Sequence, residues 1–197
     1  MRLISGSAGG IPLEVPKSVT RPTQDRVRQA VFNMLGELIE GARVLDVFAG
    51  SGAFGLECLS RGASSALLVD QDRGACEVMK KNVAKTRLDG ASIRQGDVFK
   101  VLPQLVTAGT QFDLVFADPP YADKPGDVDL SAKLAADPDF FKLVVPGGSV
   151  VLESRVTKGG SASWSPWEVM RDREYGSTRI LWLRKPVHVE IPQSPAL

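Results

Sequence analysis

The stretch Asp46-Val47-Phe48-Ala49-Gly50-Ser51-Gly52-Ala53-Phe54-Gly55 decides the fold, because it turns a predicted strand, Arg43 to Phe48, sharply into a helix. Glycine is needed there because a side chain would resist a positive φ angle and would keep the backbone away from a ligand. A carboxylate at the strand end followed by such a turn is typical of a nucleoside-binding loop in an α/β protein.

Around this stretch, short apolar runs alternate with longer segments of helical periodicity, which predicts an α/β fold with a mostly parallel sheet. The predicted strands are Arg43 to Phe48, Ala66 to Asp70, Ser92 to Gln95, Phe112 to Ala117, Ser149 to Glu153 and Ile180 to Arg184, the last pairing with Trp167 to Arg171 across Tyr175-Gly176-Ser177. Gly147-Gly148 is predicted to turn into the fifth strand. The predicted helical core faces are Val27, Val31, Met34, Leu35, Leu38 and Ile39, then Ala75, Met79 and Val83, then Val98, Val101, Leu102 and Leu105.

Composition favours a single cytoplasmic domain. The 197 residues are 43% apolar, which is enough for one substantial core. The net charge of +1 means that a polyanion would have to meet locally concentrated cations. Two cysteines outside any C-x-x-C pair give no support for a metal site or a disulfide framework, and neither a signal segment nor a membrane span is expected. We expect a monomer.

The glycine-rich loop does not by itself identify the ligand that it binds. Gly50, Gly52 and Gly55 match the dinucleotide pattern G-x-G-x-x-G, with Asp70 near the offset of a ribose-binding acid. A pyrophosphate favours a bare helix N-terminus, whereas Asp46 suits a ligand with a cationic amino-acid end, which favours S-adenosylmethionine. The alternative is a tight turn that binds nothing.

Three further carboxylates follow predicted strands or begin predicted helices. Asp70 ends the second strand, where it could accept hydrogen bonds from both ribose hydroxyls. Asp72 is expected to cap the next helix. Asp97 could either cap the helix that begins at Val98 or accept a hydrogen bond from an adenine amino group.

The most specific signal is Asp118-Pro119-Pro120-Tyr121, directly after an apolar strand. Ligands of open α/β sheets bind at this end of the strands, and the prolines leave carbonyl acceptors without amide donors. Asp118 and the Pro119 carbonyl could therefore hold the two N–H groups of an exocyclic base amine while Tyr121 stacks on the ring. A rigid proline turn with a surface tyrosine is the alternative.

These motifs, with the segment Arg21-Pro-Thr-Gln-Asp-Arg-Val-Arg-Gln-Ala-Val-Phe-Asn-Met-Leu35, resemble the RsmD family, which contains guanine-N2 methyltransferases of bacterial 16S ribosomal RNA. The resemblance runs from Met1 to about Arg184 and implies a Rossmann-like class I methyltransferase, whose seven-stranded sheet has its last strand antiparallel. It implies S-adenosylmethionine as cofactor and Asp118, Pro119, Pro120 and Tyr121 as the receptor of the target base. The implied cofactor-binding residues are Thr23, Arg26, Asp46, Phe48, Ala49, Gly50, Ser51, Gly52, Asp70, Gln71, Asp97, Val98 and Asp118.

The N-terminal segment is the main departure from this family. Residues 1–22 are predicted to form an arm with a small hairpin at Gly9-Gly10, ahead of a methyltransferase domain at 23–185 and a loose tail at 186–197. Family members carry several cations where this chain has Ser7 to Pro12, so fewer phosphate contacts are expected. The cations expected to contact ribosomal RNA or an assembling small subunit are Arg2, Lys17, Arg21 and Arg28. Ordinary solvated helix charges are the alternative for the helical arginines.

Three other functions stay open. The Asp-Pro-Pro-Tyr motif is shared with adenine-N6 methyltransferases of DNA and RNA. A nicotinamide-dependent oxidoreductase would use the same glycines, but the single histidine, His188, lies in the predicted tail. A non-catalytic RNA-binding or assembly module would explain why the N-terminal arm has few cations, although the intact motif at Asp118 argues against it.

Overall fold

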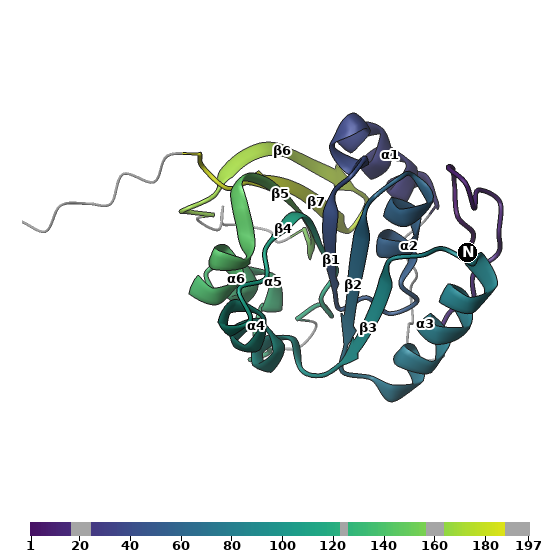
Figure 1. Ribbon diagram of the computed structural model, residues 1–197. Coiled ribbons are helices and arrows are strands. Elements are labelled where there is room, and N and C mark those ends of the chain that lie inside the picture. The colour runs from purple at the N-terminus through teal and green to yellow at the C-terminus, as the bar shows by residue number, and fades with distance from the viewer. Residues whose placement is uncertain (17–24, 123–125, 157–163, 188–197) are drawn as a thin grey trace, which may run out of the picture.

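The computed structural model describes residues 1–16, 25–122, 126–156 and 164–187. Within these residues, seven strands form one sheet with helices on both faces (Figure 1). The strands are β1 (Arg43–Val47), β2 (Ser65–Asp70), β3 (Ala91–Gln95), β4 (Phe112–Ala117), β5 (Val144–Arg155), β6 (Glu168–Tyr175) and β7 (Thr178–Arg184). The helices are α1 (Asp25–Leu35), the 3-10 helix η1 (Gly36–Ile39), α2 (Ala53–Ser60), α3 (Arg73–Thr86), α4 (Val98–Thr107), α5 (Leu130–Ala135) and α6 (Pro138–Leu143).

The sheet has the strand order β3-β2-β1-β4-β5-β7-β6. Strands β1 to β5 run parallel, while β7 is antiparallel to both β5 and β6. This arrangement confirms the predicted seven-stranded sheet and its antiparallel last strand. The direction of winding reverses between β1 and β4, and open α/β sheets bind ligands beyond the carboxyl ends of the strands at such a point.

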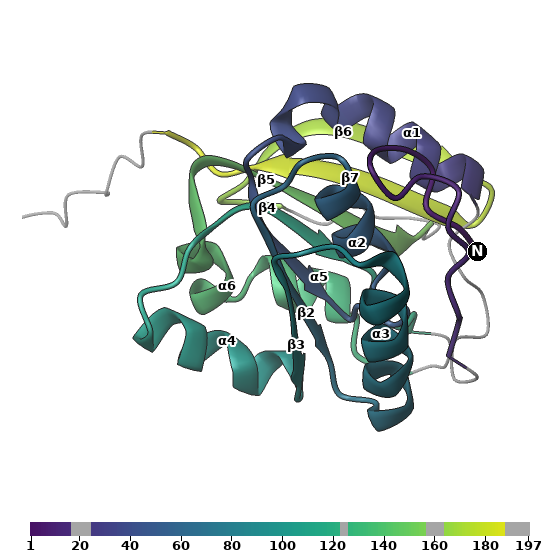
Figure 2. The ribbon, with the colours of Figure 1, turned by 45° about the vertical axis from the view of Figure 1, so that its right-hand side comes forward.

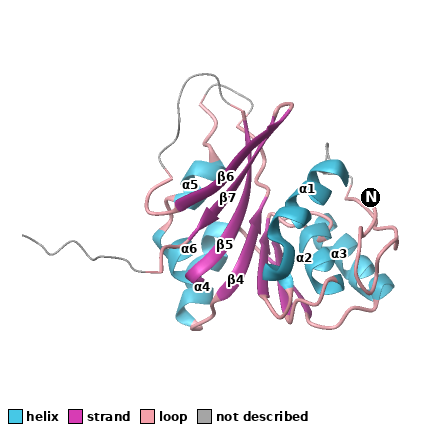
Figure 3. Ribbon diagram, turned by 90° about the horizontal axis from the view of Figure 1, so that it is seen from above, coloured by secondary structure: helices cyan, strands magenta, loops and turns pink. Residues whose placement is uncertain are grey.

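Helices lie along both faces of the sheet (Figures 2 and 3), and each set packs against the sheet through an apolar layer. One joins side chains of α1, α2 and α3, including Phe32, Leu56 and Met79, to one face of the sheet. The other joins α4, α5 and α6 to the opposite face, including Leu102 and Phe140. Because both faces are covered, β1 and β4 consist almost entirely of buried residues, as expected for central parallel strands.

Two predicted details need correction. Strand β5 begins at Val144 rather than Ser149 and contains Gly147 and Gly148, with a register irregularity against β4. The glycines therefore lie within an irregular strand instead of preceding it. Leu38 does not belong to the core face of the first helix, because the chain tightens into η1 and leaves this side chain 51% exposed.

The first residues form the predicted small hairpin. An antiparallel bridge joins Arg2 to Pro12, and the Leu3 amide donates to the Ile11 carbonyl at 3.0 Å. Leu3 and Leu13 are buried in the same apolar layer as α1 and α2. Among the described residues no helix has the length and apolarity to span a membrane.

Candidate active site

The turn from β1 into α2 is built around Asp46. Its carboxylate is 3% exposed, and its Oδ2 accepts a hydrogen bond from the Gly55 amide at 3.0 Å. Gly50 has a φ of 55°, in the region that favours glycine. Gly55 must lack a side chain because a Cβ there would lie 2.2 Å from Cδ2 of Leu68 on β2. The spacing of the glycines thus lets α2 start close against the sheet with its loop open above it.

Three carboxylates converge at this end of the sheet. Burial, helped by the charges of Asp118 and Asp70, raises the pKa of Asp46 to about 8, although the Gly55 hydrogen bond acts in the opposite direction. All three side chains line one cleft. Three arginines also line the cleft, but five acids outnumber them, which favours a cationic ligand over an anionic pyrophosphate. The arginines are Arg26, Arg28 and Arg155, and the acids are Asp46, Asp70, Asp72, Asp118 and Glu153.

Asp70 supports the loop from β2. Its Oδ2 accepts from the Gly50 amide at 2.8 Å, and its Oδ1 accepts from the Asp72 amide at 2.9 Å. A carboxylate offers about four lone-pair sites, so both oxygens keep acceptor capacity for a ligand. Asp72 caps α3 through the Ala75 amide at 2.7 Å, which confirms its predicted role.

Asp97 caps α4, because its Oδ1 accepts from the Phe99 amide at 2.8 Å. The capping role, one of the two that the sequence left open for Asp97, is therefore confirmed. The other role, a contact with adenine, stays a prediction. Val98 is buried in the layer below the sheet, and neither residue lines the cleft, unlike Phe48, Ala49, Gly50, Ser51 and Gln71. Gly52 also lies outside the lining, although its φ of 75° begins α2.

The segment Asp118 to Tyr121 follows β4 and lines the same cleft. The Tyr121 hydroxyl donates to Oε1 of Glu153 at 2.7 Å and lies 3.1 Å from the Thr178 hydroxyl. Burial raises the Tyr121 pKa, and the neighbouring carboxylates Glu153 and Asp118 raise it further. The tyrosine is therefore a neutral donor whose ring is tethered at its far end.

The sequence did not reveal Glu153 and Thr178 as site residues. Glu153 is 8% exposed, and its carbonyl accepts a hydrogen bond from the Ser131 hydroxyl at 3.1 Å. Thr178 and Tyr175 come from the β6–β7 hairpin and also line the cleft. An acidic residue in an otherwise apolar strand was the available signal for Glu153, whereas Thr178 reaches the cleft only through strand pairing.

The cleft has a volume of about 1190 Å³. Small-molecule pockets usually measure about 300 to 1,000 Å³, so this space accommodates a nucleoside cofactor with an additional base. The donor and acceptor set fits S-adenosylmethionine. Carboxylates of the lining would face the cationic groups of this ligand, the Asp70 carboxylate can accept from ribose hydroxyls, and the Gly50 loop lets a ligand approach the backbone.

Comparisons with known proteins agree with this geometry. The family model described as "Conserved hypothetical protein 95" matches residues 1–184. The chain is 35% identical over 177 residues to "Ribosomal RNA small subunit methyltransferase D" of Escherichia coli, covering 89% of this chain and 85% of that protein. The chain belongs to the RsmD family.

Solved structures show the same fold. An Escherichia coli protein superposes with a TM-score of 0.78 at 31% identity, over 95% of this chain and 99% of its own. An RNA methyltransferase from Salinibacter ruber, solved with S-adenosyl-L-homocysteine, gives a TM-score of 0.63 at 16% identity over 87% of this chain and 97% of its own. At this sequence identity, the similarity shows a common fold and nothing more.

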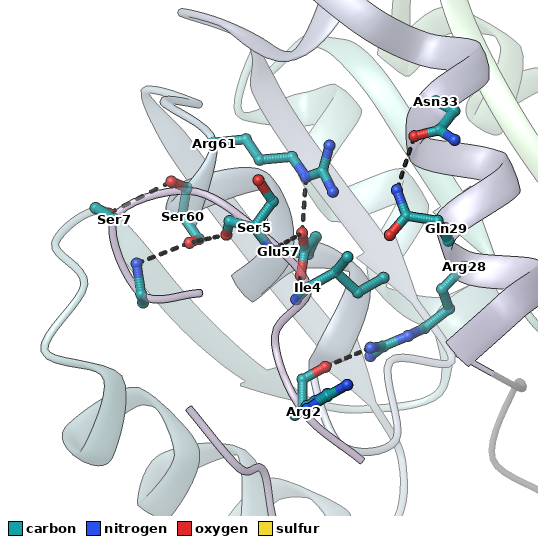
Figure 4. A network of polar contacts seen from close by, with 11 residues as sticks. Arg2, Ile4, Ser5, Ser7, Arg28, Gln29, Asn33, Glu57, Ser60 and Arg61 are labelled. Carbon is teal, nitrogen blue, oxygen red and sulfur yellow. Dashed lines mark hydrogen bonds and ion pairs between the residues drawn. The ribbon is translucent and has the colours of Figure 1, made fainter. Parts of the chain in front are cut away.

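In this RsmD-family chain the N-terminal hairpin is docked through buried polar contacts (Figure 4). Glu57 of α2 has no exposed surface, and its carboxylate accepts from the Ile4 amide at 2.6 Å and the Ser5 amide at 3.0 Å. Arg61 pairs with the same carboxylate at 2.7 Å. The hairpin is therefore part of the cleft wall, to which Met1 contributes.

Of the predicted RNA-contacting residues that the structure describes, one is exposed and one is buried at the cleft. Arg2 is exposed, whereas Arg28 has no exposed surface, lines the cleft and donates to the Arg2 carbonyl. Contact of these two arginines with RNA stays a prediction. Arg26, predicted to contact the cofactor, is exposed at the cleft. Lys17, Arg21 and Thr23 lie outside the described residues.

Proposed function

We propose that this chain transfers the methyl group of S-adenosylmethionine to the N2 amino group of a guanine in small-subunit (16S) ribosomal RNA. The observation that carries the proposal is that Asp118-Pro119-Pro120-Tyr121 and the Asp46 and Asp70 carboxylates open into one cleft. The name of the Escherichia coli relative supports ribosomal RNA as the substrate.

The cofactor half of the cleft would be formed by β1 and β2. Asp70 would accept from the ribose hydroxyls, and the loop at Gly50 would approach the methionine end near Asp46 and Arg26. Thr23 and Asp97 belong to the same proposal, as contacts to the methionine and adenine ends. When bound, S-adenosylmethionine supplies a methyl group activated by its sulfonium.

The base half would be formed by the segment after β4. Asp118 and the Pro119 carbonyl would accept the two amino hydrogens, which orients the nitrogen for in-line attack and stabilises the positive charge that develops on it. Tyr121 would stack on the base with its ring held by Glu153 and Thr178. Asp118 thus acts by position and charge. The methylated nitrogen carries a positive charge and is strongly acidic, so its surplus proton would pass to the Asp118 carboxylate or to water without a strong base.

Glu153 favours guanine among the possible bases. Guanine presents an N1–H donor beside its amino group, whereas adenine N1 and cytosine N3 are acceptors. A carboxylate next to the Tyr121 hydroxyl supplies an acceptor for N1–H and would repel the lone pair of the other two bases. Adenine-N6 methylation, the closest alternative, would gain nothing from this carboxylate.

Mass spectrometry of nucleosides tests the proposal. Unmethylated 16S RNA, small ribosomal subunits and DNA are incubated with the protein and labelled S-adenosylmethionine. We expect labelled N2-methylguanosine from RNA, lost by more than 100-fold in Asp118→Ala but retained in the control Asp113→Ala, at the other end of β4. Labelled N6-methyladenosine instead would show that the target base is adenine and not guanine. If no nucleic acid were labelled, the proposed function would be wrong, and a nicotinamide-dependent enzyme or a non-catalytic assembly module would remain. Titration with NADH would distinguish these two functions.

A further inference from the structure

Strand β6 sorts its charges onto two faces. It is the edge strand beyond β7 and carries the run Arg171-Asp172-Arg173-Glu174-Tyr175. Side chains alternate between the faces of a strand, so the two arginines share one face with Tyr175 and the two acids share the other. The register against β7 agrees, because Arg171 pairs with Trp182, Arg173 with Ile180 and Tyr175 with Thr178.

The acidic face is partly neutralised within the sheet. Arg179 of β7 forms an ion pair with Asp172 at 2.5 Å, and this contact lowers the pKa of Asp172. Within the described part of the chain, the Arg171 and Arg173 guanidiniums donate to carbonyls of their own strand, at 2.7 Å and 3.2 Å. The two cations on the other face are exposed and lack a carboxylate partner within hydrogen-bond distance in the described chain.

This arginine face leads directly to the cleft. Tyr175 and Thr178 line the cleft, and Arg173 and Arg171 continue the same row along the strand away from it. Neighbouring positions of the row are about 6.6 Å apart, since a strand rises about 3.3 Å per residue. Such spacing suits successive phosphates of an extended nucleic-acid strand. Beyond Arg171 the row ends at the ion pair of Arg184 with Glu168, at 2.7 Å.

We propose that the RNA strand flanking the target base lies along this face of β6, with its phosphates on Arg173 and Arg171. This inference rests on the proposed function, because it takes the occupant of the cleft to be a base of RNA. It also accounts for how a chain with a net charge of +1 could hold a polyanion beside three carboxylates. Arg173 and Arg171 place local positive charge next to the cleft.

The test compares Arg171→Gln/Arg173→Gln with Lys85→Gln/Lys100→Gln, which removes the same charge from exposed positions on α3 and α4. Filter binding of an unmethylated 16S RNA transcript is measured at several salt concentrations. Each lost phosphate contact reduces the slope of log K against log salt by about 0.7 to 0.9. We expect a reduction of about 1.4 to 1.8 for the arginine pair, little change for the lysine pair and unchanged S-adenosylmethionine affinity in both.

Equal slopes for the two double variants would overturn the inference. Because binding is read without turnover, this result stays distinct from a failure of the proposed function, in which the parent protein would methylate no RNA. A loss of S-adenosylmethionine affinity in the arginine variant would also count against the inference, since it would indicate damage to the cleft rather than to an RNA path.

Discussion

At the scale of single residues, burial changes what a carboxylate does. Asp46, Asp70 and Asp118 all line the cleft, but Asp46 is nearly inaccessible, and this burial raises its pKa to about 8. At neutral pH it is largely protonated in the ligand-free protein. A cation placed in the cleft would favour the ionised form, so the charge of this group is linked to ligand binding.

Replacing Asp46 by Asn should flatten the pH dependence of stability. An acid whose pKa is raised on folding holds its proton in the native state and loses it in the unfolded state, so stability falls as pH rises between about 3.8 and about 8. Thermal unfolding of the ligand-free protein at pH 5 and pH 8 measures this. We expect the parent to lose at least about 1 kcal/mol more than the variant, roughly 2 to 4 °C in a domain of this size. Parallel pH profiles would contradict the assignment.

Replacing Glu153 by Gln should weaken the preference for guanine. The amide keeps an oxygen for the Tyr121 hydroxyl but loses the charged acceptor for guanine N1–H. Single-turnover methylation compares RNA carrying guanine at the mapped target with RNA carrying 2-aminopurine, which keeps the amino group and lacks N1–H. We expect the guanine preference to fall about 10-fold, equivalent to about 1.4 kcal/mol.

Tyr121→Phe is the matched control for that experiment, because it removes the tether and leaves the carboxylate. It should slow transfer to both bases alike. If Tyr121→Phe reduced the guanine preference as much as Glu153→Gln, Glu153 would only position the tyrosine.

At the scale of elements, periodicity predicted the strands and core helices well because each buries an apolar face that shows in the sequence. The start of β5 was predicted wrongly because consecutive glycines, here Gly147 and Gly148, are typical of a turn. In the structure the residues on either side of them pair with β4. The Asp118 to Tyr121 motif could be found because its residues are consecutive. Glu153 was marked only as an acid in an apolar strand, and Thr178 was not marked at all, because their meeting with Tyr121 depends on the pairing of β5 with β7.

The docking of the hairpin on α2 gives a prediction at this scale. Glu57→Ala would leave the Ile4 and Ser5 amides and the Arg61 guanidinium without their carboxylate. An unsatisfied buried donor costs about 1 to 3 kcal/mol, so we expect at least about 2 kcal/mol of lost unfolding free energy in denaturant titration. Hydrogen exchange should quicken in residues 1–13.

The control is Glu77→Ala, whose ion pair with Lys80 lies on the surface of α3, so the unfolding free energy should stay close to that of the parent. If the two variants were equally stable, Glu57 would not anchor the hairpin.

At the scale of the whole molecule, the cofactor would bind on the β1 and β2 side of the cleft and the target base on the side after β4. A substitution in one half should therefore weaken one ligand and leave the other bound. Asp70→Ala should weaken S-adenosylmethionine binding by about 1 to 3 kcal/mol through lost charge-assisted hydrogen bonds, while RNA affinity stays close to that of the parent. Calorimetry and filter binding measure the two affinities. An unchanged dissociation constant for the cofactor would reject the ribose role of Asp70.

The central claim is that one cleft brings a methyl donor on β1 and β2 next to an amine receptor after β4. A crystal structure with sinefungin, an analogue that carries an amine in place of the methyl sulfonium, tests it most directly. The account predicts the ribose of sinefungin at Asp70 and its amine facing Asp118. An analogue bound away from Asp118, or with its ribose away from Asp70, would contradict it.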